Sequence, residues 1–523
     1  MRISEHQNTI DQIKPVLLRT PMVVPKWSHT SPICPPLGLA YVAASLRQFG
    51  YEVRCIDALG EAPLQKTVSE NAKYLYFGLS IKEILQHLAL KEFNVLFVSL
   101  MFSHDWPMTK YFIKTIKKTY PEVITVCGGE HISACPKFSM EDCPEIDICV
   151  LGEGEETSID ILKTIEQKKS LSKVNGIVYR SEEGIITNPK RSRISQLDNI
   201  PLPAWDLFPL ENYLSNRLGY GVNPGRTMPM LISRGCPFQC TFCSSPQMWT
   251  TKWQARDPNC VIEEMQFYID KYKITNFDFY DLTAIVRKDW IIKFCQKIIK
   301  KNWNITWQMP SGTRSEALDD ETLGLMMLSG QKHISYAPES ASKTTLQKIK
   351  KKIKIENMKE SIKSALSKGM GVKLNLMLGF PDETHKEMLE TLRFVIYAAF
   401  VGVSDVYLAS FAPYPGSELF DEMCKNGQIS KIDDEYFLNL ASYTDLLHSY
   451  SYSRHVGHRM LSVYRLGGMS MFYILNFILR PKRILRLFIN IINKKDESKF
   501  ENSILQMVNR FKRSKKHKIT DKK

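Results

Sequence analysis

Three cysteines stand close together in the segment Arg234-Gly-Cys-Pro-Phe-Gln-Cys-Thr-Phe-Cys243, directly after an apolar run. Cys236, Cys240 and Cys243 offer soft thiolates, which bind zinc or iron–sulfur clusters. A tetrahedral zinc site needs a fourth ligand, but the next cysteine, Cys260, lies well downstream with no Cys or His beside it. A [4Fe–4S] cluster on three thiolates leaves one iron open to a non-protein ligand. The segment therefore predicts a reactive cluster, with structural zinc or incidental cysteines as the alternatives.

The spacing Cys-x3-Cys-x2-Cys, with the aromatic Phe242 before the last cysteine, resembles the radical S-adenosylmethionine (SAM) enzymes. In that family the open iron binds the amino and carboxylate groups of SAM. An electron from the cluster then cleaves SAM to methionine and a 5′-deoxyadenosyl radical. The resemblance implies a partial (β/α)6 barrel, SAM as cofactor with Phe242 beside it, a small-molecule substrate, and an external electron donor such as flavodoxin or ferredoxin.

Segments downstream resemble the same family in the same order. Phe279-Tyr-Asp281 closes a predicted strand, and the resemblance implies that Asp281 meets the SAM amino group. Ala337-Pro-Glu-Ser340 resembles a Gly-Ile-Glu-Ser segment, which implies that Glu339 and Ser340 lie near the SAM ribose. Carboxylates suit ribose hydroxyls because they accept two hydrogen bonds. Residues 379–384 and 414–419 also resemble family segments. Taken singly, each segment is better explained by turn chemistry or helix capping. In this order behind the cysteine motif, together they support the resemblance.

The segment 1–175 alternates short apolar runs with helical stretches. Strands are predicted at 16–19, 52–58, 94–100, 123–128 and 147–152, and helices at 37–49 and 108–119. This alternation predicts βαβ units, that is, a doubly wound, Rossmann-like parallel sheet with helices on both faces. Ligands of such sheets bind outside the carboxyl ends of the strands. Gly128-Gly-Glu-His131 and Gly152-Glu-Gly-Glu155 should therefore lie at the ligand-facing edge.

Residues 35–41, 128–131 and 151–156 resemble the cobalamin-binding domain fused to many radical SAM enzymes. The branch is that of the anaerobic magnesium-protoporphyrin monomethyl ester cyclase, which also holds methyltransferases acting on unactivated carbon or phosphorus. The resemblance implies bound cobalamin and, as its contacts, Gly128, Gly129, His131, Gly152 and Glu153. His131 is equally explained as a hydrogen-bonding residue of its loop.

The motif Asp-x-His-x-x-Gly, which supplies a histidine ligand to cobalt in methionine-synthase-type domains, is absent from the sequence. Cobalamin is therefore expected to bind without a protein histidine on cobalt. The alternative is a doubly wound module that holds no corrin.

Four parts are expected along the chain: a cobalamin-binding domain at 1–175, a hairpin and linker at 176–225, the radical SAM core at 226–420, and a helical C-terminal region with a basic tail at 421–523. The hairpin should turn at Glu183-Gly184, and prolines 201, 203 and 209 mark the linker. The strands predicted for the barrel are 230–233, 276–280, 305–309, 333–336, 372–378 and 406–411.

The amino-acid composition indicates the cellular compartment and limits the classes of binding partner. Of 523 residues, 24% are charged and 11% aromatic, which excludes a disordered chain. Twelve cysteines are too sparse for a secreted disulfide scaffold and no secretory signal is visible, so a reducing cytoplasm is expected. Residues 481–523 hold 14 Lys/Arg and four Asp/Glu, so +10 of the net charge of +15 lies in the tail. The catalytic core therefore gives no sign of nucleic-acid binding.

The C-terminal region contains an apolar run at 469–479, about half of the roughly 20 residues that span a bilayer. Apolar stretches flanked by Lys and Arg are typical of interfacial helices on anionic membranes. Residues 466–523 therefore predict peripheral contact with the inner face of the membrane, which would favour a hydrophobic substrate. A terminal helix packed on the barrel explains the pattern equally well.

Two enzymatic reactions fit these features. We favour methyl transfer to an unactivated carbon or phosphorus centre, because this use is the more diverse in the branch; the alternative is an oxidation or cyclisation without methyl transfer. A third hypothesis is an electron-transfer or cofactor-carrying protein that uses the cluster alone. The SAM-like segments after Cys243 argue against it. No residue is predicted to act as a catalytic acid or base, and no motif selects among tetrapyrrole, lipid, peptide and phosphonate substrates.

Overall fold

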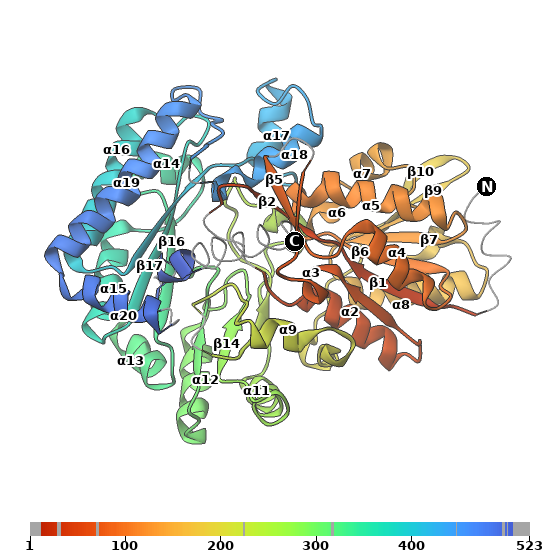
Figure 1. Cartoon of the computed structure of the whole chain (residues 1–523), viewed down its shortest axis with the longest axis horizontal. Coiled ribbons are helices and arrows are strands. Elements are labelled where there is room, and N and C mark those ends of the chain that lie inside the picture. The colour runs from red at the N-terminus through yellow and green to blue at the C-terminus, as the bar shows by residue number, and fades with distance from the viewer. Residues whose placement is uncertain are drawn as a thin grey trace, which may run out of the picture.

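A computed structural model describes residues 12–28, 33–69, 73–222, 225–314, 318–445, 447–493, 497–498 and 500–505. Two α/β domains lie side by side, and the C-terminal helices run along the second domain and over the junction (Figure 1). The chain is thus a mixed α/β protein with a helical C-terminal region, as predicted.

A seven-stranded sheet forms the core of the N-terminal domain. Its strands lie in the order β10 (Gly184–Thr187), β9 (Ile177–Ser181), β8 (Ile148–Val150), β7 (Ile124–Gly128), β6 (Val95–Ser99), β1 (Pro15–Arg19) and β3 (Arg54–Asp57). The five neighbouring strands β8, β7, β6, β1 and β3 are parallel to one another. Strand β9 pairs antiparallel with β8, and β10 pairs antiparallel with β9. All five strands predicted for the segment 1–175 are present.

Helices cover both faces of this sheet because successive strand residues point to opposite sides. Leu17 of β1 packs in one core with α2 (Leu37–Gln48) and α8 (Gly154–Glu166). Its neighbour Leu18 packs in another core with α5 (Trp106–Thr119). The doubly wound fold and both predicted helices are confirmed.

The predicted hairpin is present, but its turn lies at Glu182-Glu183, since Gly184 pairs with Ser181. It extends the N-terminal sheet at one edge. A second, small antiparallel sheet of β2 (Met22–Pro25), β5 (Tyr74–Phe77) and β4 (Lys66–Val68) was not predicted. Strand β4 is fully exposed and β2 ends in proline, so neither shows an alternating apolar pattern.

Six parallel strands form the barrel of the second domain, in two three-stranded sheets. One sheet has the order β11 (Thr227–Met230), β14 (Asn276–Phe279) and β15 (Thr306–Gln308), and the other β16 (His333–Glu339), β17 (Gly371–Leu378) and β18 (Asp405–Ser410). A parallel bridge between Thr313 and Tyr336 connects the two sheets. The predicted partial barrel is confirmed.

The first barrel strand runs over Thr227–Met230, not over 230–233 as predicted. The prediction missed it because Pro229 breaks the apolar run. Proline is tolerated there because β11 is an edge strand of its sheet. Between the strands lie the outer helices α11 (Pro258–Tyr272), α12 (Lys288–Lys301), α13 (Asp320–Leu328), α15 (Ile355–Ser367) and α16 (His385–Val401).

The C-terminal region consists of α17 (Glu418–Lys425), α18 (Asp434–Asn439), α19 (His458–Leu479) and α20 (Lys482–Ile492). Helix α19 packs on α16, and its buried Arg465 donates hydrogen bonds to the carbonyls of Leu408 in β18 and of Tyr443. Among the helices that the structure describes, none has the length and apolar character needed to cross a membrane.

Candidate active site between the two α/β domains

The cysteine loop, which we define as residues 235–253, is closed at its base by a short antiparallel ladder. Strand β12 (Ser233–Arg234) pairs with β13 (Gln254–Ala255). Gly235 opens the loop with φ of +87°, and a Cβ atom there would lie 2.3 Å from the carbonyl oxygen of Lys252. Only glycine fits this conformation and this approach.

The three cysteines of this loop are free and partly accessible. Cys236 Sγ lies 3.4 Å from Thr283 Oγ1. Cys240 and Cys243 line a cavity of about 460 Å³ together with carboxylates of α17. Burial raises the pKa of Cys243 to about 11, so its thiolate requires a compensating positive charge such as a metal.

These thiols fit an iron–sulfur cluster better than a single ion. In the described part of the chain, no three His, Cys, Asp or Glu side chains converge as ligands of one metal ion. A cluster binds its thiolates on separate irons, so ligands spaced along one accessible loop are suitable. Burial also raises the pKa of Cys240, while Lys351 and Arg314 lower it. Lys351 and Arg314 therefore lie close enough to Cys240 to stabilise the negative charge of its thiolate.

Asp281 fixes the chain directly before the cysteine loop. Its buried carboxylate accepts hydrogen bonds from Ser233 Oγ at 2.6 Å and from the backbone amides of Ser233 and Ile232 at 2.5 and 3.2 Å. Burial raises its pKa to about 6, and these donors oppose that rise. The contact of Asp281 with SAM stays a prediction.

Glu339 ends β16 with φ of +66°, and its carboxylate lies 2.9 Å from the buried ammonium of Lys351. The same ammonium lies 5.9 Å from the ring centroid of Phe242. Ser340 is fully buried, and its hydroxyl lies 3.0 Å from Thr391 Oγ1 in α16. The structure thus brings Glu339 and Phe242 together, whereas the hydroxyl of Ser340 faces a helix. Their contacts with SAM stay predictions.

Gly128 ends the central strand β7 at the carboxyl edge of the N-terminal sheet, and Gly129 follows it. Gly129 has φ of +110°, and a Cβ atom there would lie 2.3 Å from the carbonyl oxygen of Leu100. His131 is buried, with Nδ1 3.0 Å from Ser103 Oγ and Nε2 3.3 Å from Ser139 Oγ. Burial lowers its pKa to about 3, so the ring is neutral.

Both histidines near this edge, His104 and His131, are buried and present no accessible ring. That cobalamin binds without a protein histidine on cobalt stays a prediction. The cobalamin contacts of Gly128, Gly129 and His131 stay predictions.

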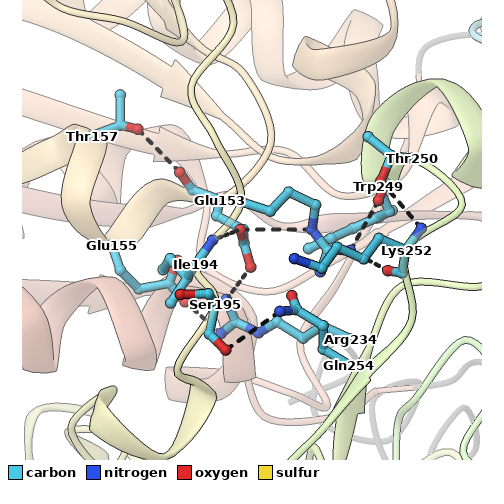
Figure 2. Close-up of polar contacts among 11 residues, drawn as sticks. Glu153, Glu155, Thr157, Ile194, Ser195, Arg234, Trp249, Thr250, Lys252 and Gln254 are labelled. Atoms are coloured by element: carbon cyan, nitrogen blue, oxygen red, sulfur yellow. Dashed lines mark hydrogen bonds and ion pairs between the residues drawn. The ribbon is translucent and has the colours of Figure 1, made fainter.

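Gly152 and Glu153 follow β8 at the same edge. Gly152 has φ of +73°, and its amide donates to Ser133 Oγ at 2.9 Å. Glu153 is buried and accepts a hydrogen bond from Arg234, directly before the cysteine loop, at 3.0 Å (Figure 2). Glu153 therefore contacts the barrel domain at the residue before this loop, and its contact with cobalamin stays a prediction. The contact of Gly152 with cobalamin also stays a prediction.

Sequence reasoning did not assign four residues that join the domains. Arg234 also donates to Glu155 at 2.5 Å, and Ser244, after the last cysteine, donates to Glu130 at 2.7 Å. The signal was present in the sequence. Carboxylates follow the glycines at both predicted strand ends, and an arginine precedes the cysteines.

Side chains of both domains face each other across the junction. Burial raises the pKa of Cys34, in the N-terminal domain, and of Tyr280, after β14, and the two side chains interact. Tyr220 keeps 41% of its surface accessible, and its ring centroid lies 6.2 Å from that of Tyr280. Met101, after β6, is 58% exposed. Accessible apolar and aromatic groups here suit a large planar cofactor and a substrate.

Two family models match the chain: the B12 binding domain over residues 28–162 and the Radical SAM superfamily over residues 230–395. Cytidylyl-2-hydroxyethylphosphonate methyltransferase of Streptomyces wedmorensis is 30% identical over 456 residues, which cover 80% of this chain and 84% of that protein. Anaerobic magnesium-protoporphyrin IX monomethyl ester cyclase of Rubrivivax gelatinosus is 25% identical over 394 residues, 74% of this chain and 66% of that protein.

Among solved structures, the cobalamin-dependent S-adenosylmethionine radical enzyme OxsB, with aqua-cobalamin and S-adenosylmethionine bound, has the same fold. The TM-score is 0.67 at 15% identity, over 97% of this chain and 81% of that chain. The fold of both matched domains is therefore shared with this structure.

Proposed function

The chain belongs to the cobalamin-dependent radical SAM enzymes, and on that premise we propose that it methylates an unactivated carbon or phosphorus centre of a small molecule. When bound, the cluster supplies the electron that cleaves SAM, and cobalamin carries the methyl group. The observation that carries the proposal is the cysteine loop held against the carboxyl edge of the N-terminal sheet. That contact would bring the two proposed cofactor sites to one junction.

A relative that is 30% identical over most of its length is named a methyltransferase, and this supports methyl transfer. The cyclase relative is less similar and is matched over a smaller part of its length. Oxidation or cyclisation without methyl transfer is therefore the second candidate.

In this proposal the residues of the chain bind the cofactors, orient the substrate and enclose both. Cys236, Cys240 and Cys243 would hold the cluster, and Asp281 would fix the approach of the loop through Ser233. The hydroxyls of Tyr407 and Tyr414 donate to the carbonyls of Tyr443 and Leu440, at 2.6 and 3.5 Å, and keep lone pairs that can accept. Such half-buried hydroxyls offer hydrogen bonds to a substrate while the surrounding protein limits water.

Anaerobic turnover with methyl-deuterated SAM tests the reaction. Candidate substrates drawn from genomic neighbours are expected to gain the deuterated methyl group, measured by mass spectrometry. A product that is oxidised or cyclised without label would favour the second candidate. Protein reconstituted with hydroxocobalamin is expected to show a corrin spectrum, and failure to take up corrin would contradict the proposal.

An external electron donor such as flavodoxin or ferredoxin is part of the proposal, because the cluster must be reduced before it can supply the electron that cleaves SAM. All twelve cysteines are free, which supports a reducing compartment, the cytoplasm.

We further propose that α20 places the enzyme on an anionic bilayer surface. Leu485, Phe488 and Ile492 are 65%, 60% and 78% exposed, and their spacing puts them on one helical face. Lys482 and Arg486 lie on the same helix, and the sequence beyond adds further basic residues. The apolar face suits the acyl chains of a bilayer, and the flanking cations suit its anionic headgroups.

Sedimentation with phosphatidylglycerol vesicles tests this contact. The full chain is expected to sediment with them and not with phosphatidylcholine vesicles, and the variant Leu485→Ser/Phe488→Ser/Ile492→Ser is expected to stay in solution. Leu90→Ser, which changes an exposed leucine of the N-terminal domain, is the control. Equal binding by the triple variant would contradict the proposal.

A further inference from the structure

The segment that carries the three cysteines is held on both sides by carboxylates of the opposite domain. Before the first cysteine, Arg234 donates from Nη1 to Glu153 Oε1 at 3.0 Å and from Nη2 to Glu155 Oε1 at 2.5 Å. After the last cysteine, Ser244 Oγ donates to Glu130 Oε1 at 2.7 Å. We call Glu130, Glu153 and Glu155 the interdomain clamp. The cluster ligands therefore lie between two contacts with the same sheet edge.

The linker between the domains strengthens the first of these contacts. The second oxygen of Glu153 accepts a hydrogen bond from the amide of Ile194 at 2.8 Å (Figure 2). Arg193 donates to the carbonyls of Trp249 and Lys252, both inside the cysteine loop, at 2.9 and 2.6 Å. The linker is thus bonded to the sheet edge on one side and to the loop on the other.

The side chains of the first contact are buried, which restricts how they can be arranged. Arg234, Glu153 and Glu155 are only 8%, 8% and 6% exposed. The guanidinium lies 3.0 Å from the carboxylate of Glu153 and 2.5 Å from that of Glu155, so two buried carboxylates face one buried cation. A planar guanidinium that bonds two separate carboxylates accepts little displacement, because both hydrogen bonds depend on its orientation.

A flexible linker alone could keep the domains together, but it would not fix a distance between two cofactors. Radical chemistry needs the reacting groups within a narrow range of positions. Buried, charged hydrogen bonds on both flanks of the ligand loop meet that need.

We propose that the interdomain clamp consists of positioning residues that set the place of the cluster relative to the corrin, so that the cobalamin-binding domain determines the geometry of the cluster loop. The inference rests on the two-cofactor function proposed above. It adds that the acidic residues at the strand ends act through the cysteine loop.

Pulsed electron paramagnetic resonance of the full chain tests this inference. Protein reconstituted with iron, sulfide and hydroxocobalamin is reduced so that both the cluster and cob(II)alamin carry an unpaired electron. The wild-type protein is expected to show one defined interaction between the two spins. Glu153→Ala/Glu155→Ala is expected to lose it and to show a broad, weaker one, whereas Glu153→Gln, which keeps an acceptor for Arg234, restores a defined interaction.

Glu264→Gln is the matched control, because Glu264 also binds a buried arginine, Arg256, but within the barrel domain. It is expected to leave the spin interaction unchanged. An alanine double variant that binds both cofactors with the wild-type interaction would overturn the inference. Failure of the wild-type protein to bind corrin would instead contradict the proposed function.

Hydrogen exchange covers the case in which the alanine variant binds its cofactors poorly. Exchange is expected to rise in peptides over 190–196 and 233–255 and to stay at the wild-type level in β16, β17 and β18. A uniform rise throughout the chain would show that the clamp serves general stability, and would overturn the positioning role.

Discussion

The buried ammonium of Lys351 lies 2.9 Å from the carboxylate of Glu339, and together they connect the end of β16 to the cysteine loop. Lys351 lies near both Phe242 and Cys240, and it lowers the pKa of the Cys240 thiol against the effect of burial. A segment predicted to meet SAM thus shares a cation with the loop predicted to hold the cluster.

Lys351→Met is expected to act in two ways. It leaves Glu339 buried without its partner, which should lower the free energy of unfolding by about 3–5 kcal/mol. It also removes a positive charge beside the cluster, so the midpoint potential of the reconstituted cluster should become more negative. Urea unfolding and redox titration measure the two effects.

Lys350→Met is the matched control, because Lys350 pairs with Glu418 at the surface. Exposed pairs contribute about 0–1 kcal/mol, and little change in either measurement is expected. Equal potentials in the two variants would contradict the role of Lys351.

Replacing any one of Cys236, Cys240 or Cys243 by alanine is expected to abolish stable cluster binding, because a three-thiolate cluster has no spare ligand. Iron and sulfide content and the visible absorbance of anaerobically reconstituted protein measure this. Cys260→Ala and Cys424→Ala, at part-exposed cysteines outside the loop, should keep wild-type iron. Retention of iron by a variant of the loop would refute the ligand assignment.

Gly235→Ala is expected to distort the cysteine loop, because the new Cβ atom would meet the Lys252 carbonyl at 2.3 Å. Gly369→Ala separates this clash from backbone strain, since Gly369 has a similar φ of +79° with nothing within 4 Å. Strain alone should destabilise the second variant by about 1–3 kcal/mol. The first should lose more stability and also lose iron. Equal iron content in the two variants would contradict the close approach.

Glu383 makes the stability of the barrel depend on pH. It is almost fully buried, and burial raises its pKa from 4.5 to about 8, although the amides of Gly379 and Phe380 donate to it. The native state holds a proton that the unfolded state releases above about pH 4.5. The stabilisation is therefore complete below that pH and is lost as the pH rises through about 8.

Glu383→Gln imitates the protonated group and has no such dependence. Its free energy of unfolding relative to wild type should rise between pH 4.5 and 8, by at most about 5 kcal/mol. Urea unfolding at several pH values measures this. Parallel curves for the two proteins would show that Glu383 does not titrate in this range.

Much of the fold was predictable because its patterns are local. Short apolar runs between helical stretches predict β1, β6 and β7, since buried parallel strands are continuous apolar runs. The prediction for β11 began too late because Pro229 interrupts the apolar run. Proline is tolerated there because β11 is an edge strand, and only the tertiary structure shows that position. The sheet containing β4 was missed because Lys66–Val68 carries no burial pattern.

The candidate site was predictable where ligands lie close in sequence, as in the cysteine motif. Glu153 shows why other parts were not. Its place after a strand predicts the sheet edge correctly, but its partner, Arg234, lies 81 residues away in another domain. Ser340 illustrates the same limit, since its motif gives no sign that its hydroxyl faces Thr391.

The bridge between Thr313 and Tyr336 gives the barrel a seam. Each three-stranded sheet has its own ladder, while in the described residues the halves are joined there by the hydrogen bonds Thr313 N to Ser335 O, at 2.7 Å, and Ala337 N to Thr313 O, at 3.4 Å. Widening the barrel at this seam would break these bonds and leave both ladders intact. Separating the two sheets at this bridge therefore costs two backbone hydrogen bonds, whereas separating strands within either sheet would break a ladder.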